Sequence, residues 1–349
     1  MSKYSVTLTD IARMIGISPR AVSAALNGNG RISSEKAKEV RALARKLGYR
    51  PNIMARGLMN GSTYLVGVVL PNVSGSFYPL VLQGIEDEAQ HLGYRVIVCS
   101  AGWDLTEEKL HIEDLIQRGV DGLVIDPGRN NTKAYELLKK SEIPYVQIFH
   151  KSPILDGPSI TVDNITGAHM ATRYLLETTN SIPYFIHGET GWMESNDRYE
   201  GFASALKEAG VPDSKIKKYL LGESITWDDG YNLLTTLAAK KKVPRAIFAI
   251  NDLTALGLMR AAYDLNINIP QKLSVVGFDN LDISGWQTSI SLTTVNQPKY
   301  DIGKVASQTL FQLIKGHKAK DIRLTPTMIV RESTPVQRGG SNKTKLVKP

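Results

Sequence analysis

Cysteine is almost absent from this chain, and no hydrophobic run is long enough to cross a membrane. The single cysteine, Cys99, excludes an internal disulfide framework and a metal site built on paired cysteines. Strand-like runs such as 64–70 are far shorter than the ~18 apolar residues of a membrane span. The N-terminus (MSKYSVT) lacks the apolar segment of a secretory signal. We therefore expect a reducing, cytoplasmic location and no membrane partner.

Signatures of catalysis are missing as well. The sequence contains no phosphate-binding GxxxxGK[ST], no HExxH, no GxSxG and no GxGxxG after a predicted strand. The six histidines show no paired spacing of metal ligands, and we expect most of them in solvated or satisfied positions. The sequence thus predicts no catalytic residue, no metal site and no cofactor, and it argues against an enzyme.

Positive charge is concentrated at one end of the chain. The first 60 residues contain eleven Lys and Arg but only three Asp and Glu, and this excess equals the net charge of +8 of all 349 residues. The rest of the chain is therefore neutral overall. A basic head on a neutral body indicates that one end binds a polyanion, although a merely solvated basic face has the same composition.

The body alternates short apolar runs with amphipathic segments of helical length. The strand-like runs are 64–70, 94–100, 122–126, 144–149, 159–162, 183–187, 218–221, 246–250, 274–278 and 292–295. Alternation of strands and helices predicts parallel sheets covered by helices on both faces. Ten strands exceed one modest sheet, so we predict two α/β lobes, with ligands bound beyond the carboxyl ends of the strands.

These patterns predict the boundaries of the domains. We expect a head over 1–50, a hinge helix and linker over 51–62, a two-lobe core over 63–338 and a disordered basic tail over 339–349. The first lobe comprises about 63–163 and 292–326, and the second about 164–291 and 327–338. The fold class is therefore α plus α/β, with a three-helix head and a two-lobe core.

The head has the pattern of a helix-turn-helix. Thr7 and Asp10 have the spacing of a capping box, which starts a first helix. Ser18 caps a second helix with Pro19 at its first position, where a missing N–H costs nothing. Ser33 starts a third helix. Many small helical bundles share this spacing, and the basic excess favours the DNA-binding version.

Motifs along residues 6–335 resemble those of the lactose-repressor (LacI) family, in order and with family spacing. In the head they are VTLTDIA (6–12), GIS (16–18), AVS (21–23), LNG (26–28) and LGYRPNIMARGL (47–58). In the body they are VGV (66–68), GIE (84–86), ND (251–252), SVVGFD (274–279), LTTV (292–295) and VRES (330–333).

The resemblance implies a DNA-binding transcription regulator, most often a repressor. Two heads of a homodimer would read a near-palindromic operator, and a core like the periplasmic sugar-binding proteins would sense a small molecule. The tail lacks the apolar heptads that make some relatives tetrameric, which favours a dimer. A solute-binding protein without a regulatory role would explain the body but not the basic head.

The resemblance also implies which residues contact DNA. Contacts to phosphates fall on Thr7, Ser18, Ser23, Asn27, Arg31, Ser33, Tyr49 and Asn52, although the hydroxyls among them suit helix caps or solvated positions as well. Arg20, near the start of the second helix, has the planar fork that pairs with guanine, unless it contacts a phosphate. Pro19 and Ala24 stand where relatives carry base-contacting side chains, so the operator should differ from the common consensus of the family.

The segment 52–60 resembles the hinge helix of the family. It is short and contains Gly57, so we expect it to be unstable in isolation and to fold when two copies meet in the minor groove. There Leu58 would wedge between base steps while Ala55 packs beside it. An ordinary apolar contact of the linker is the alternative for Leu58.

The effector residues implied by the resemblance lie on both predicted lobes. They are Phe77, Asp163, Arg198, Trp227, Asn251, Asp279 and Gln297. Fixed carboxylates, amides and a guanidinium suit vicinal hydroxyls, and aromatic rings stack on sugar rings, so a sugar is favoured. A purine or nucleoside remains the alternative. Arg198 and Asp279 could instead form a structural ion pair.

Overall fold

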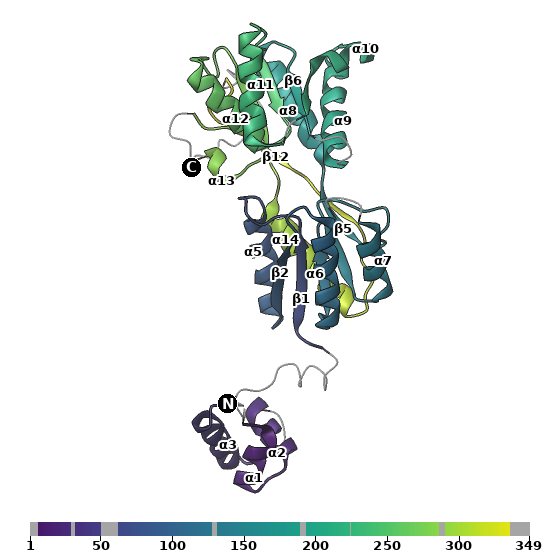
Figure 1. Cartoon of the computed structure of the whole chain (residues 1–349), viewed down its shortest axis with the longest axis vertical. Coiled ribbons are helices and arrows are strands. Elements are labelled where there is room, and N and C mark those ends of the chain that lie inside the picture. Colours follow the sequence, from purple (N-terminus) through teal and green to yellow (C-terminus); the bar gives the residue numbers. More distant parts are fainter. Residues whose placement is uncertain are drawn as a thin grey trace, which may run out of the picture. The chain divides into compact units, whose positions relative to one another are not determined.

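The computed structural model describes residues 6–28, 32–49, 62–127, 131–188, 193–223, 225–285 and 290–335 (Figure 1). The contacts divide the chain into two compact units, 1–63 and 64–349. The first unit holds the helices of the head, and the second holds two α/β lobes with one six-stranded sheet each. The predicted fold class is confirmed, whereas the hinge helix expected at 52–60 lies outside the described residues.

The head is built from three short helices, α1 (Leu8–Ile15), α2 (Pro19–Asn27) and α3 (Ser34–Lys46). Their starts are determined locally. Thr7 and Asp10 make both hydrogen bonds of the predicted capping box. The hydroxyls of Ser18 and Ser33 each accept a backbone N–H three residues further on, at 3.2 and 3.3 Å. These side chains satisfy amides that the first turn of a helix leaves without partners.

The sheet of the first lobe has the order β11-β5-β4-β3-β1-β2, and all of its strand pairs are parallel. Its strands are β1 (Leu65–Leu70), β2 (Arg95–Ser100), β3 (Gly122–Ile125), β4 (Tyr145–Ile148), β5 (Ser159–Val162) and β11 (Ile322–Leu324). Its helices are α5 (Tyr78–His91), α6 (Leu105–Gln117), α7 (Thr132–Lys140) and α14 (Lys299–Ile314). Parallel pairing follows from the strand–helix alternation that the sequence predicts.

The sheet of the second lobe repeats this topology, with the order β12-β10-β9-β8-β6-β7. Its strands are β6 (Tyr184–His187), β7 (Leu220–Glu223), β8 (Ala246–Ala249), β9 (Ser274–Asp279), β10 (Thr293–Asn296) and β12 (Thr327–Ile329). Its helices are α8 (Asn164–Thr179), α9 (Met193–Glu208), α10 (Asp213–Ile216), α11 (Trp227–Ala239), α12 (Asp252–Asp264) and α13 (Asp282–Gly285), with a 3-10 turn η1 (Lys217–Tyr219). Only β12 departs from the pattern, since it pairs antiparallel with β10.

The chain crosses between the lobes three times, and one crossing differs from the prediction. The predicted assignment of residues 292–296 to the first lobe is wrong. β10 pairs with β9 in the second sheet, with Thr293 opposite Val276. The crossing therefore comes later, at Gln297 and Pro298, immediately before α14. The other crossings follow β5, at Asp163, and separate β11 from β12.

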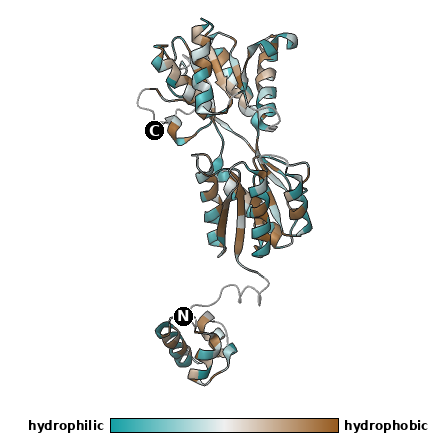
Figure 2. Ribbon diagram, in the orientation of Figure 1, coloured by the Kyte–Doolittle hydropathy of each residue, from teal (hydrophilic) through white to brown (hydrophobic). Residues whose placement is uncertain are grey.

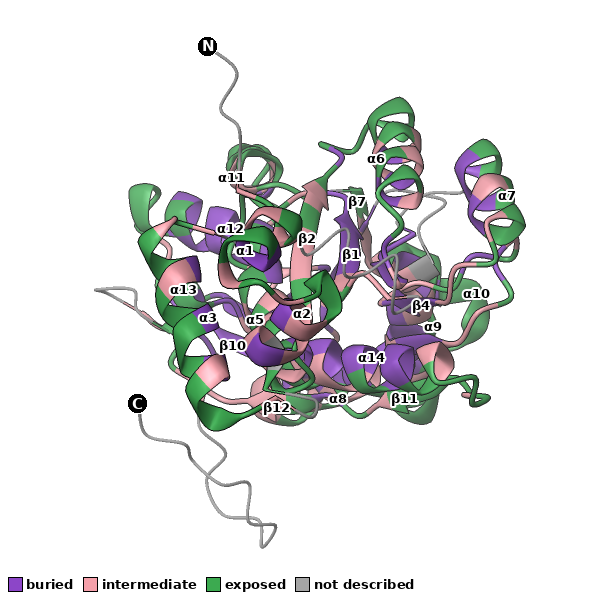
Figure 3. Cartoon of the chain, turned by 90° about the horizontal axis from the view of Figure 1, so that it is seen from below, coloured by how far each residue is buried: buried purple, intermediate pink, exposed green. Residues whose placement is uncertain are grey.

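The strands of the sheets are mostly hydrophobic, whereas the outer faces of the helices carry hydrophilic residues (Figure 2). Five of the six residues of β1 are buried, and eight of the sixteen residues of α14 are buried as well. Figure 3 shows this burial by colour. A Cβ atom at Gly303 would lie 2.0 Å from the carbonyl oxygen of Val81, so glycine lets α14 approach α5 closely. None of the described helices is long and apolar enough to span a bilayer.

Candidate functional site

The second helix of the head presents its N-terminal end to solvent. Val22 and Ala25 are buried in the core shared with α1 and α3, whereas Pro19 and Arg20 are exposed and Ala24 is half-buried. An exposed guanidinium at this end of α2 is placed as a base-reading side chain requires. The geometry is compatible with the predicted role of Arg20 and leaves that role a prediction.

Several of the predicted phosphate contacts also hold the helices of the head in place. The Thr7 hydroxyl donates to Asp10 Oδ2 at 2.7 Å, and bonds from Thr7 lower the pKa of that carboxyl. Thr7, Ser18 and Ser33 are exposed, and Ser23 and Tyr49 are half-buried. The predicted contacts Arg31, Asn52, Ala55 and Leu58, and the side chain of Asn27, lie outside the described residues.

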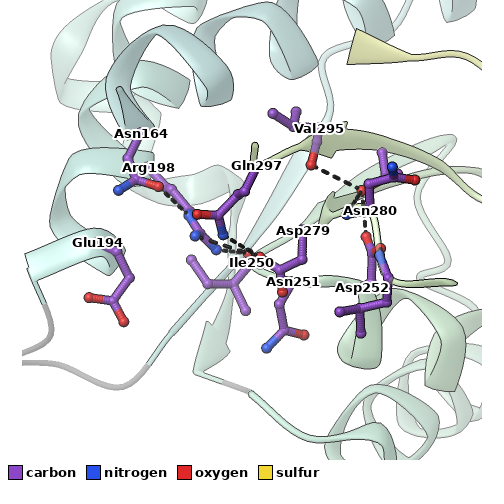
Figure 4. Close-up of polar contacts among 12 residues, drawn as sticks. Asn164, Glu194, Arg198, Ile250, Asn251, Asp252, Asp279, Asn280, Val295 and Gln297 are labelled. Atoms are coloured by element: carbon purple, nitrogen blue, oxygen red, sulfur yellow. Dashed lines mark hydrogen bonds and ion pairs between the residues drawn. The ribbon is translucent and has the colours of Figure 1, made fainter. Parts of the chain in front are cut away.

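In the core, Arg198 on α9 is the centre of a polar cluster (Figure 4). Its Nε donates to Asn164 Oδ1 at 3.0 Å, and its Nη1 donates to the carbonyl oxygen of Ile250 at 2.5 Å. Its Nη2 lies 3.8 Å from Asp279 Oδ1, and its guanidinium carbon lies 3.7 Å from the centroid of the Phe278 ring. With 6% exposure, Arg198 is held in one orientation.

Asp279 ends β9 with a φ of +119°, a conformation that side chains rarely adopt. Its Oδ1 accepts a hydrogen bond from Gln297 Nε2 at 2.7 Å, and its carbonyl oxygen accepts one from Lys299 Nζ. Burial raises the pKa of Asp279, although Arg198 and Lys299 oppose this shift. The structure therefore brings together Arg198, Asp279 and Gln297, three of the predicted effector residues.

Two other predicted effector residues, Asp163 and Asn251, are helix caps. Asp163 Oδ1 accepts the backbone N–H of Thr166 at 3.0 Å at the start of α8. Asn251 Oδ1 accepts the backbone N–H of Thr254 at 2.8 Å, while its Nδ2 donates to the carbonyl oxygen of Ile225 at 2.9 Å. Both side chains therefore stabilise the starts of helices. That they also bind an effector remains a prediction.

The two predicted aromatic residues differ in their surroundings. The Phe77 ring lies 4.9 Å from that of Phe149, and Lys299 Nζ lies 5.8 Å from its centroid, which places Phe77 beside the Asp279 cluster. Trp227 begins α11 and packs against the hydrophobic core of the second lobe. A Cβ atom at Gly257 would lie 2.0 Å from its carbonyl oxygen. The backbone of Trp227 therefore lies close against α12.

A chain of polar residues between the lobes was not predicted. The Tyr78 hydroxyl donates to Asp126 Oδ2 at 2.7 Å. His150 Nδ1 lies 2.5 Å from Asp126 Oδ1, and His150 Nε2 lies 2.6 Å from Glu194 Oε2. A sequence signal did exist, since Asp126 ends one predicted strand and His150 directly follows another, where the carboxyl edge of a parallel sheet brings side chains together. In the described part of the chain no cluster of three or more His, Cys, Asp and Glu suits a metal ion.

Comparison with protein families gives two matches. The model described as bacterial regulatory proteins, lacI family, matches residues 7–52, and the one described as a periplasmic binding protein-like domain matches residues 177–334. The HTH-type transcriptional regulator RegA of Clostridium saccharobutylicum is 32% identical over 336 residues, which cover 95% of this chain and 99% of RegA.

Two solved structures extend the comparison. The lac repressor dimer bound to operator and the anti-inducer ONPF shares the fold, with a TM-score of 0.83 at 22% identity over 94% of this chain and 99% of that one. A LacI family transcriptional regulator from Enterococcus faecium with bound ribose has a TM-score of 0.67 at 26% identity over 78% and 100%. This chain belongs to the LacI family of bacterial transcriptional regulators, with a DNA-binding head and a ligand-binding core.

Proposed function

We propose that a small molecule, a sugar by preference, binds between the lobes beside Arg198 and Asp279 and controls the affinity of the head for a near-palindromic operator. The observation that carries this proposal is the cluster of oriented polar groups from both lobes, in which Gln297 and Lys299 reach Asp279 at the crossing between β10 and α14. Such a cluster changes when the lobes move, and lobe movement is the means by which a ligand shifts the populations of two states.

The polar groups favour a ligand with several hydroxyls. Each buried side-chain nitrogen or oxygen in the described residues has a hydrogen-bond partner, so an effector must exchange bonds with groups that are already paired. Hydroxyls both donate and accept, which lets one sugar ring replace bonds of a carboxylate, an amide and a guanidinium together. The ribose-bound relative supports this preference, and the ring of Phe77 offers an apolar face for stacking.

A thermal-shift screen tests the effector class. Ribose, glucose, galactose and cellobiose would be compared with hypoxanthine, guanine and adenosine, because a specific ligand at 100 times its Kd raises stability by about 2.7 kcal/mol. Asp279→Asn should abolish the shift, whereas Asp228→Asn, at an exposed position on α11, should retain it. A shift by a purine alone would replace the sugar with a purine effector, and a shift that survives Asp279→Asn would move the site elsewhere.

On the DNA side, we propose that Arg20 reads a guanine in the major groove while Pro19 and Ala24 contribute shape. Arg20 is exposed at the N-terminal end of α2, where its fork reaches base edges if this end enters the groove. Thr7, Ser18, Ser23, Asn27, Arg31, Ser33, Tyr49 and Asn52 then contact phosphates, and Leu58 and Ala55 enter the minor groove. In this scheme the protein acts by binding and not by catalysis.

We further propose that the regulator is a homodimer. Large apolar side chains are exposed on both lobes of the core, among them Val98 and Leu110 in the first and Leu253 and Tyr263 in the second. Association would remove such surface from water, and a twofold dimer matches a near-palindromic operator. Sedimentation of the free protein distinguishes the mass of a dimer from that of a monomer or tetramer.

A further inference from the structure

The imidazole of His150 lies between two carboxylates that belong to different lobes. Asp126 follows β3 in the first lobe, as His150 follows β4, and its Oδ1 lies 2.5 Å from Nδ1. Glu194 lies in the first turn of α9 in the second lobe, and its Oε2 lies 2.6 Å from Nε2. The side chain of His150 is 13% exposed, and that of Asp126 is fully buried.

With both acids as carboxylates, this geometry requires a proton that a neutral imidazole does not have. A neutral ring carries one N–H, so it can donate to one of the two carboxylates and presents a lone pair to the other. The imidazolium ion donates to both. Burial by itself would lower the pKa of His150, but Asp126 and Glu194 together hold that pKa well above its usual value.

Other charged and titratable groups face this contact from each side. Tyr78 on α5 donates to the second oxygen of Asp126 at 2.7 Å, and Glu108 on α6 is a further acid near Asp126. On α9, the charge of Arg198 adds to that of His150 in lowering the pKa of Glu194, and Asp197 is a further acid near Glu194. From the second lobe, the charge of Asp279 adds to burial and to Asp126 in raising the pKa of Tyr78. The next residue along the chain, Lys151, pairs with Asp321.

We propose that protonated His150 is a latch between the lobes, which holds Glu194 against the first lobe and makes the spacing of the cleft depend on pH. Asp126 orients the ring within its own lobe, so opening the lobes breaks the bond from His150 to Glu194 and retains the bond to Asp126. The inference concerns the regulation of the effector site and depends on the proposed function only for its consequence at the operator.

The direction of the pH effect follows from proton linkage. Because the anion Glu194 contacts the ring only in the closed arrangement, the pKa of His150 is higher with the latch closed than with it open. The latch is fully present below the ordinary histidine pKa of about 6.5 and is lost as pH rises through the raised value. Alkaline pH should therefore open the lobes of the free protein.

The first experiment measures the titration of His150 itself, in the full chain without effector or DNA. Histidine ring resonances would be followed from pH 5 to 10, and the one missing from His150→Gln assigns the residue. We expect a pKa well above the ordinary histidine value, and a lower pKa in Glu194→Gln, which keeps the shape but removes the charge. A pKa at or below 6.5, or one unchanged by Glu194→Gln, would overturn the proposal.

The second experiment measures the spacing of the lobes. Spin labels at Lys140→Cys on α7 and Thr236→Cys on α11, in a Cys99→Ser background, report the distance between the lobes. In the wild type we expect longer distances at pH 9 than at pH 6. In Glu194→Gln we expect the longer distances at both pH values. Glu208→Gln is the matched control, because His169 Nε2 lies 2.9 Å from Glu208 Oε2 within the second lobe.

Each result separates this inference from the proposed function. A distance that does not change with pH, or an equal change in Glu208→Gln, contradicts the latch while leaving effector and operator binding intact. A chain that opens as expected but gives no thermal shift with sugars or purines retains the latch and contradicts the proposed effector site. If His150→Gln does not fold, Glu194→Gln and its control still decide the result.

Discussion

The head and the cleft of this regulator place their cations differently. In the head, Arg20, Lys38 and Arg45 are exposed, and the ion pairs are loose or at the surface, such as Arg13 with Asp10 at 3.7 Å. In the cleft, Arg198 and Lys299 are buried, and protein oxygens accept their hydrogen bonds. An exposed cation attracts a polyanion over a distance and releases counterions on contact, whereas a buried one has a fixed direction. The exposed cations of the head therefore suit contact with a polyanion, whereas the buried cations between the lobes suit oriented contacts with individual oxygen atoms.

The largest expected effect tests the buried side of this comparison. Arg198→Ala removes the buried cation beside Asp279 and the donor to the Ile250 carbonyl, so it should lower the free energy of unfolding by about 3–5 kcal/mol. The matched control is Arg173→Ala, which breaks an exposed pair with Glu177 at 2.8 Å and should cost less than about 1 kcal/mol. Urea unfolding of both variants measures the difference. Equal losses would mean that burial does not distinguish the two arginines.

The next effect concerns the predicted hinge. Leu58→Ala should weaken binding to the specific operator by a few kcal/mol, on the order of the unstacking that a wedge supports, while binding to random DNA and to effector stays nearly unchanged. Leu58 lies outside the described residues, so the titrations test the sequence-based prediction directly. Equal weakening on random DNA would contradict the wedge.

A smaller effect is expected where the head reads bases. Arg20→Ala should cost roughly 1–3 kcal/mol at one guanine of each half-site and relax specificity there. Arg31→Ala should weaken all sequences alike and lower the salt slope by about one. Binding curves on operators varied one base at a time, at two salt concentrations, separate the two roles. If Arg20→Ala weakens binding to every operator variant equally, Arg20 contacts phosphate. Arg13→Ala is the control, because it measures how much the loss of one positive charge alone weakens binding.

The smallest effect returns to the core. Burial raises the pKa of Asp252 to about 7, against hydrogen bonds from Ser284, Thr294 and Leu281. Since the folded-state pKa lies above the unfolded one, its contribution is fully present below about pH 4 and is lost as pH rises through 7. Between pH 6 and pH 7 the free energy of unfolding of the wild type should therefore fall by about 1 kcal/mol more than that of Asp252→Asn. An identical difference in both proteins would contradict the shift.

The head was predictable because its signals are local. Thr7, Ser18 and Ser33 each cap a helix through an amide three residues away, so a short window of sequence determines where each helix begins. The alternation of strands and helices in the core is equally local, and it sufficed for the prediction of two α/β lobes. The resemblance of short motifs to the LacI family then indicated Arg198, Asp279 and Gln297 as candidates, which the structure brings together.

What the tertiary structure decided depends on partners that are distant in the sequence. The assignment of β10 to the second lobe rests on its pairing with β9, because an apolar run such as 292–295 suits either sheet. Gln297 reaches Asp279 across 18 positions and His150 reaches Glu194 across 44, over a crossing between the lobes. The sequence by itself predicted ten of the twelve described strands and missed the short strands β11 and β12. Only packing decided which side chains meet, because contacts over such separations follow from sheet order and lobe spacing.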